Sequence, residues 1–243
     1  MTGREAAFAA AVAGLLAGYN NTGGGQPWRQ RWYPAINLGA TGALLAAATA
    51  SGLTAADLGL SPGRVPAGLR GAAGPAGALA AAWLGLAAAP ATRPVLADQR
   101  VTGLTWPQLA YQVTVRIPVG TVLWEETAFR GVLQAALRRV LPGPAAIAVT
   151  GGMFGIWHVR PTMAALRVNG IGGADRGRPP GLAQAAAVAG AVLATAVAGV
   201  VLSGFRDRSG SVAGPVLLHL TANCGAALAA RTAAGARQAR AGR

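Results

Sequence analysis

Two adjacent glutamates and two histidines are the residues of this sequence best suited to chemistry. Glu125 and Glu126 are the one neighbouring pair among seven acidic residues. His158 and His219 are the two histidines of the chain, and both lie in apolar surroundings. A water molecule held between a carboxylate and imidazoles can be activated to hydrolyse a peptide bond. These side chains therefore predict a hydrolytic site.

Glu126, His158 and His219 each have a polar or aromatic side chain four positions away in the sequence. On a helix, positions i and i+4 lie on the same face. Ionisable groups at membrane depth are costly and are expected to face a cavity and to pair with one another. The three helices that carry these pairs are therefore expected to place them on faces directed toward a shared interior. The pairs are Glu126 with Arg130, Phe154 with His158, and His219 with Asn223.

The two glutamates are predicted to have different roles. Glu126 is expected to form an internal ion pair with Arg130 that orients their helix. Glu125 has no partner at helical spacing except Arg130, five residues on, and is therefore the predicted catalytic carboxylate. Because successive side chains of an α-helix diverge by about 100°, Glu126 is expected to point elsewhere on the helix.

The remaining candidates also have structural interpretations. Phe154 is expected to pack against His158 and fix its ring. Asn223 has the alternative role of joining two helices by a hydrogen bond. Cys224, the single cysteine, points away from Asn223 and is expected to be an inert thiol that forms no intramolecular disulfide.

Composition predicts a membrane protein. The chain is 53% hydrophobic and 12% charged, with a mean hydropathy of +0.42, which lies outside the soluble range. The net charge of +14 comes from Arg alone, because the chain contains no Lys. The Arg residues stand between apolar stretches, where they face anionic lipid headgroups, so nucleic acid is not expected as a partner. Arg in place of every Lys, with abundant Ala and Gly, indicates a GC-rich bacterial genome.

The apolar stretches predict an all-α, polytopic integral membrane bundle of about seven transmembrane helices around an intramembrane polar cavity. The first stretch is expected to be an uncleaved span, because Glu5 interrupts the basic region that a signal peptide needs. Arg116 and Pro118 predict an irregular fourth helix. The stretches are residues 6–19, 33–52, 71–90, 104–123, 144–157, 181–204 and 211–230.

No boundary in the sequence separates a soluble module. Residues 1–103 are expected to form N-terminal transmembrane helices and loops, residues 104–230 the catalytic helical core, and residues 231–243 a basic tail. The distribution of Arg among short connections favours a cytoplasmic C-terminus in a multi-pass protein of the cell membrane.

The three motifs together resemble the CPBP family of intramembrane proteases. This family includes the CAAX prenyl endopeptidases and the bacterial abortive-infection or bacteriocin-immunity proteins, and its pattern is EExxxR, FxxxH, then HxxxN or HxxxD. All three motifs occur here in that order on separate apolar segments, over roughly residues 104–230. They are Glu125-Glu126-x-x-x-Arg130, Phe154-x-x-x-His158 and His219-x-x-x-Asn223.

The resemblance implies an integral-membrane endopeptidase. By motif position, Glu125 would activate the attacking water with the assistance of His158. His219 and Asn223 would stabilise the oxyanion of the tetrahedral intermediate. The substrate would be a membrane peptide or protein, and in a GC-rich bacterium a prenylated CAAX substrate is not expected.

The supporting residues follow from the same motifs. Glu126 with Arg130 would hold the site together, and Phe154 would support His158.

A zinc ion is the alternative to a metal-free mechanism. Glu125, His158 and His219 could supply three ligands and leave a position open for water, and members of the family are commonly called metalloproteases. The spacing does not follow HExxH, and a glutamate that ligates zinc cannot easily also be the base. We therefore expect a glutamate-based mechanism that requires no cofactor.

Two interpretations without proteolysis stay open. The first is a non-catalytic immunity or scaffold protein that binds a peptide or membrane partner through the same cavity. The second is a small transporter that uses the Glu and His residues as a proton relay. The intact motifs favour the protease, because no motif carboxylate or histidine is missing.

Overall fold

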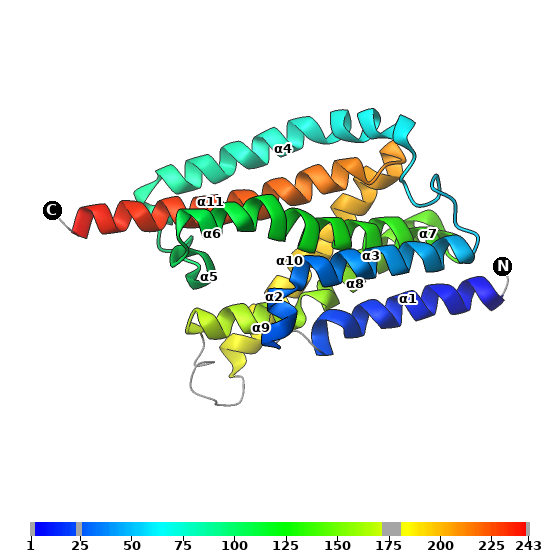
Figure 1. Ribbon diagram of the computed structural model, residues 1–243, viewed down its shortest axis with the longest axis horizontal. Coiled ribbons are helices and arrows are strands. Elements are labelled where there is room, and N and C mark those ends of the chain that lie inside the picture. The colour runs from blue at the N-terminus through cyan, green and yellow to red at the C-terminus, as the bar shows by residue number, and fades with distance from the viewer. Residues whose placement is uncertain (1–2, 23–25, 172–180, 242–243) are drawn as a thin grey trace.

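The computed structural model of the protein describes residues 3–22, 26–171 and 181–241, with side chains described up to residue 234. Within these ranges the regular elements are all helical (Figure 1), which confirms the all-α fold class. The α-helices are α1 (Gly3–Thr22), α2 (Pro27–Arg31), α3 (Tyr33–Ala50), α4 (Val65–Ala88), α5 (Gln99–Thr102), α6 (Trp106–Tyr111), α7 (Gln134–Arg138), α8 (Gly143–Trp157), α9 (Val159–Val168), α10 (Leu182–Ser209) and α11 (Ala213–Ala241). Two 3₁₀ turns, η1 (Pro62–Arg64) and η2 (Pro90–Thr92), and two π-helical segments, η3 (Gln112–Leu123) and η4 (Glu126–Leu133), complete the set.

Each predicted apolar stretch is helical, but fewer helices than expected have the length and composition of a membrane span. Three do so by these criteria: Pro62–Ala88, Leu182–Ser209 and Ala213–Ala234. Helix α8 has 15 residues and covers only about 22 Å of a hydrocarbon core of roughly 30 Å. The protein is thus a helical membrane protein, whereas seven crossings stay a prediction.

The helix that contains the fourth apolar stretch, residues 104–123, continues beyond the end of that stretch. Helices α6, η3, η4 and α7 follow one another without a break, so that residues 106–138 form one long central helix. Its irregularity was predicted from Arg116 and Pro118, and η3 is indeed π-helical with Pro118 inside it. The Arg116 side chain extends away from the central helix. It donates hydrogen bonds to the backbone and side-chain oxygens of Gln30 and lies over the ring of Tyr33.

The helices are arranged along a common long axis around this central helix. Figure 1 shows α4 beside α11 on one side of it and α3 and α1 on the other, while α10 crosses the bundle and packs against α8. The start of α1 and the end of α11 lie at opposite ends of the molecule. Helix α11 continues beyond residue 230, so the part of the predicted basic tail that is described, up to Ala241, is helical.

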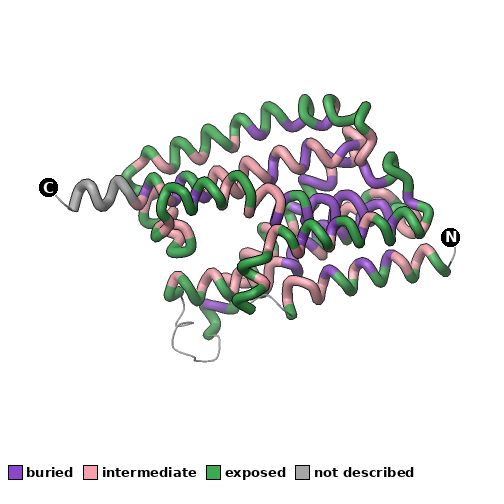
Figure 2. Tube along the Cα trace, in the orientation of Figure 1, coloured by how far each residue is buried: buried purple, intermediate pink, exposed green. Residues whose placement is uncertain are grey.

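Burial is concentrated in the second half of the central helix. Figure 2 shows that α4 is largely exposed, whereas the core gathers around η4 and α7. Every residue from 124 to 137 is buried. A helix buried on all faces normally carries apolar side chains only, yet this segment includes Glu125, Glu126 and Arg130. The bundle therefore encloses a charged centre.

Close packing of α8 on α10 determines where α8 can lie. A Cβ atom added to Gly155 would stand 2.6 Å from the carbonyl oxygen of Val192, and one added to Gly199 would stand 2.9 Å from the Cα of Gly151. Small residues at such crossings let two helix backbones approach closely. Since His158 directly follows the last residue of α8, this approach also sets the position of that histidine.

We expect Gly155→Ala to lower the free energy of unfolding by about 1–3 kcal/mol, because the added methyl group overpacks the crossing. Gly152→Ala on the same helix is the matched control, since a Cβ there meets nothing within 4 Å. That control should be neutral or stabilising by up to about 1 kcal/mol through helix propensity. Chemical unfolding in detergent micelles measures both changes, and equal stabilities of the two variants would contradict the packing argument.

Candidate active site

The two glutamates lie side by side in the middle of the central helix, where η3 gives way to η4: Glu125 precedes η4 and Glu126 is its first residue. Glu125 is 4% exposed and Glu126 is 0% exposed. A π-helix has a wider turn than an α-helix, so adjacent side chains diverge by less than roughly 100°. This geometry lets both carboxylates reach one side of the helix, whereas the sequence predicted that Glu126 would point elsewhere.

Glu126 joins the central helix to α11. Its Oε1 atom accepts a hydrogen bond from Arg130 Nη1 at 2.9 Å, which is the ion pair that the spacing predicted. The same oxygen lies 2.7 Å from His219 Nδ1. A carboxylate partner favours the proton on Nδ1, so the ring is oriented with Nε2 pointing away from Glu126.

Glu125 is held from the other side by a residue of α8. Its Oε1 atom accepts a hydrogen bond of 3.0 Å from the indole nitrogen of Trp157. Its Oε2 atom is buried without a hydrogen-bond partner among the described residues and lies 3.9 Å from His219 Nε2. His219 therefore stands between the two carboxylates, with one ring nitrogen toward each.

Phe154 packs against three of the charged or titratable groups. The guanidinium carbon of Arg130 lies 4.0 Å from the centre of the Phe154 ring. The rings of His158 and His219 meet Phe154 edge-on, with centroids 4.6 Å and 5.9 Å away. Phe154 thus packs against both histidines, whereas the sequence had assigned it to His158 alone.

His158 lies at the end of α8, and its orientation is set by its own helix. The Nδ1 atom lies 2.7 Å from the carbonyl oxygen of Phe154, which favours the proton on Nδ1 and leaves Nε2 as an acceptor. Within the described ranges His158 makes no hydrogen bond to Glu125 or to His219. The structure brings it to the same aromatic cluster but not into direct contact with either carboxylate.

Asn223 lies one turn after His219 on α11 and is half-buried. Across residues 3–22, 26–171 and 181–234, no hydrogen bond to its amide group is found. The neighbouring thiol of Cys224 faces the carbonyl of Val113 at 3.6 Å, away from the carboxylates.

Several residues that position the site were not predicted from the sequence. The amide nitrogens of Asn20 and Asn21, at the end of α1, donate to the carbonyls of Trp157 and Ile156. These bonds join the end of α1 to the last carbonyls of α8. A pair of Asn residues at the end of an apolar run is the only sequence feature that marked them.

Two further contacts support the carbonyl groups of the central helix. Asn37 of α3 donates to the carbonyl of Gly120 at 2.5 Å. Arg206 of α10 donates through Nε to the carbonyl of Arg130 at 3.1 Å. Because π-helical geometry disturbs the regular backbone ladder, such side-chain donors help to keep the local register.

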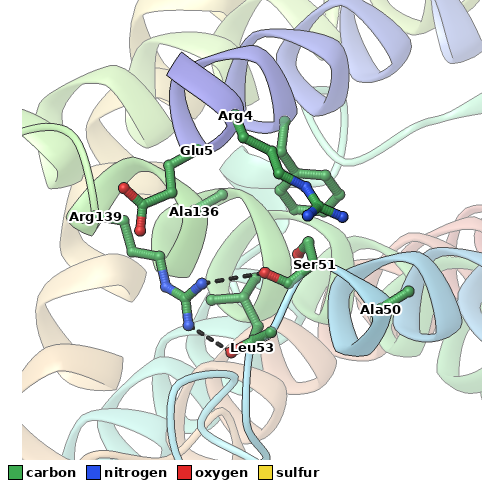
Figure 3. Close-up of a pocket in the computed structure, with 9 residues that line it drawn as sticks. Arg4, Glu5, Ala50, Ser51, Leu53, Ala136 and Arg139 are labelled. Carbon is green, nitrogen blue, oxygen red and sulfur yellow. Dashed lines mark hydrogen bonds between the residues drawn. The ribbon is translucent and has the colours of Figure 1, made fainter. Parts of the chain in front are cut away.

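A pocket of about 320 Å³ lies elsewhere in the bundle (Figure 3), between the first turn of α1 and the ends of α3 and α7. Arg139 crosses this pocket to donate to the carbonyls of Ser51 and Gly52. None of the predicted site residues lines it. The polar cavity that was expected around the glutamates stays a prediction.

In the described part of the chain the structure does not bring Glu125, His158 and His219 together as a set of three metal ligands. No group of three or more His, Cys, Asp and Glu side chains in the described part of the chain is placed to hold a metal ion. His219 Nδ1 is engaged by Glu126 and His158 Nδ1 by a backbone carbonyl, which leaves the Nε2 atoms of both rings free, as they are in metal-ligating histidines. We therefore derive no catalytic step through a metal.

Comparison with known families agrees with the motifs. The family described as type II CAAX prenyl endopeptidase Rce1-like matches residues 107–225, a segment that contains all three motifs. No curated protein and no solved structure matches the chain. This segment therefore matches the CAAX protease family of membrane endopeptidases, which supports the resemblance that the motifs carry.

Proposed function

We propose that this chain is a multi-pass cell-membrane endopeptidase that hydrolyses a peptide bond in or near the bilayer. The position of His219 between two buried carboxylates, 2.7 Å from Glu126 Oε1 and 3.9 Å from Glu125 Oε2, is the observation that carries the proposal. Burying such groups is costly, and the cost is consistent with a site retained for chemistry. The match of residues 107–225 to a protease family supports the same reaction.

In the proposed mechanism Glu125 is the general base. Its Oε2 atom is buried and free of hydrogen-bond partners in the described part of the chain. A water on this oxygen would transfer a proton to Glu125 as it attacks the carbonyl carbon, and Glu125 would return that proton to the leaving amine when the C–N bond breaks. Because His219 Nε2 lies 3.9 Å away, the water and a carbonyl oxygen bound to His219 would stand next to one another, as attack requires.

His219 and Asn223 are the proposed oxyanion donors. The carboxylate of Glu126, bonded to Nδ1, holds the His219 ring in one orientation, so that Nε2 can hydrogen-bond to the oxyanion when it carries a proton. The Asn223 amide on the next turn of α11 would add a second donor. Arg130 balances the charge of Glu126 and keeps the carboxylate in place.

His158 is proposed to assist proton transfer. With Nδ1 turned to the carbonyl of Phe154, its Nε2 atom is the nitrogen available to accept a proton. Binding of substrate would have to bring the reacting water or the leaving amine to this nitrogen, since His158 does not touch Glu125 in the described structure.

The proposed mechanism requires no metal, and chelation tests it directly. Treating the purified protein with EDTA or 1,10-phenanthroline should change kcat by less than about twofold, because each step uses protein groups alone. Metal analysis of the same sample should show well under one zinc per chain. Loss of activity on chelation that added zinc restores, with one bound metal per chain, would overturn this part of the proposal.

The proposed substrate is a peptide or protein held in the membrane. The matched family is named for prenylated CAAX substrates. The composition of this chain indicates a bacterial origin, so we propose an unprenylated membrane or secreted peptide instead. A non-catalytic immunity or scaffold function is the alternative that the experiment must separate from proteolysis.

Mass spectrometry of newly formed peptide termini tests the proposed function. Membranes from cells that express the wild type are compared with membranes that contain Glu125→Gln at the same protein level. We expect termini found only with the wild type, which would identify the substrate and the cut site together. If the two samples agree while a biological effect of the protein persists in Glu125→Gln, the non-catalytic function is correct.

A further inference from the structure

Trp157 makes the one hydrogen bond that the structure shows to Glu125 within its described residues. The indole Nε1 donates to Oε1 at 3.0 Å, and the side chain is 1% exposed. The three sequence motifs do not include this residue, although it immediately precedes His158. An indole nitrogen can only donate, so Glu125 Oε1 is the acceptor of this bond.

The bond makes the two oxygens of Glu125 different. Oε1 is occupied by the indole, whereas Oε2 is buried without a partner and faces His219 Nε2 at 3.9 Å. A glutamate carboxylate otherwise rotates easily about its last torsion angle, which has a broad energy minimum. With Oε1 held, the free oxygen stays directed at the space beside His219.

The indole itself is well placed to act as a rigid support. The Tyr19 ring stacks on it with a centroid distance of 5.8 Å, and the Phe129 ring meets it edge-on at 5.5 Å. Its backbone carbonyl accepts a hydrogen bond from Asn20. A donor whose rotamer is locked by packing can hold a catalytic group in one geometry.

We propose that Trp157 is a positioning residue, which binds Oε1 of Glu125 and thereby presents Oε2 as the oxygen that takes the proton from the attacking water. This inference rests on the proposed endopeptidase function. It adds that the base works through one defined oxygen, and that α8 supplies the donor that selects it.

Trp157→Phe and Trp124→Phe form a matched pair for the test. Trp124 is equally buried, belongs to the same aromatic cluster, and its indole nitrogen has no hydrogen-bond partner among the described residues. Both changes remove similar packing, but only Trp157→Phe removes a donor to Glu125. The assay uses an internally quenched peptide that spans the cut site found in membranes, with the full chain in liposomes.

For Trp157→Phe we expect kcat to fall about 10- to 100-fold while KM stays within about twofold, because a hydrogen bond to a charged group is lost from the catalytic step. For Trp124→Phe, kcat should stay within about threefold of the wild type. Equal losses in the two variants would mean that Trp157 only fills space, and the inference would be wrong.

A second variant of Trp157 guards against a folding defect. Benzothienylalanine replaces the indole N–H by sulfur with almost the same shape, so packing is kept while the donor is lost. It should reproduce the loss of kcat at unchanged thermal stability, and wild-type kcat in this variant would overturn the inference. A wild-type protein that cleaves no peptide would instead contradict the proposed function, so the two failures are distinguishable.

Discussion

Glu125→Gln is expected to lower kcat by about 100- to 10,000-fold, the range found when a general base is removed. Glutamine has the same shape and can still accept the hydrogen bond from Trp157 Nε1 through its amide oxygen. It cannot take a proton from water, so the chemical step is lost while the local packing is kept. The measurement is single-turnover cleavage of the identified substrate in liposomes.

Glu5→Gln is the control for this experiment. Glu5 lies on the first turn of α1, beside the pocket of Figure 3 and apart from the two motif glutamates. Its replacement should leave kcat within about twofold, as expected for a surface substitution away from the chemistry. If Glu125→Gln cleaves as fast as the wild type while both variants are folded, Glu125 is not the base and the proposed mechanism fails.

Arg130→Met is expected to have the largest effect on stability. The Arg130 and Glu126 side chains are 0% and 1% exposed and are joined by a hydrogen bond of 2.9 Å. Removing one partner of a buried ion pair leaves the other charge uncompensated and costs about 3–5 kcal/mol. Chemical unfolding in mixed micelles, followed by circular dichroism, measures the free energy of unfolding.

The double variant Glu126→Gln/Arg130→Met separates the ion pair from the packing of the arginine side chain. Because both charges are then absent, it should lose less stability than Arg130→Met alone. Arg138→Met is the surface control: Arg138 pairs with Asp207 at the protein surface, and such pairs contribute at most about 1 kcal/mol. A loss for Arg130→Met no greater than that of the control would contradict an energetically important buried pair.

The N-terminal part of the chain lies outside the segment that matches the family, yet its side chains form hydrogen bonds to helices that carry the site. Residues 107–225 carry the motifs, yet Asn20 supports the carbonyl of Trp157 and Asn37 supports the carbonyl of Gly120. From the sequence, residues 1–103 were expected to form N-terminal transmembrane helices and loops, and no site residue was predicted among them. Polar side chains of this region in fact hold the two helices that carry Glu125 and His158.

The sequence by itself determined the features that depend on local patterns. The length of the apolar stretches predicted the helices, and the spacing of Glu126 and Arg130 predicted an ion pair that the structure contains. The ordered motifs predicted the family whose model matches residues 107–225. These predictions succeed because hydrophobic runs and i, i+4 spacing act within one helix, so no knowledge of distant neighbours is needed.

Only the tertiary structure decided which partners meet at the glutamates. His219 bonds to Glu126 across 93 residues of sequence, and Trp157 bonds to Glu125 across 32. These contacts depend on how α8 and α11 pack against the central helix and on its π-helical segments, which let both carboxylates face one side. A local sequence pattern cannot predict these contacts, because they join residues that are far apart in the sequence. The contacts depend on how closely the helices pack, as at the crossing of Gly155 with α10.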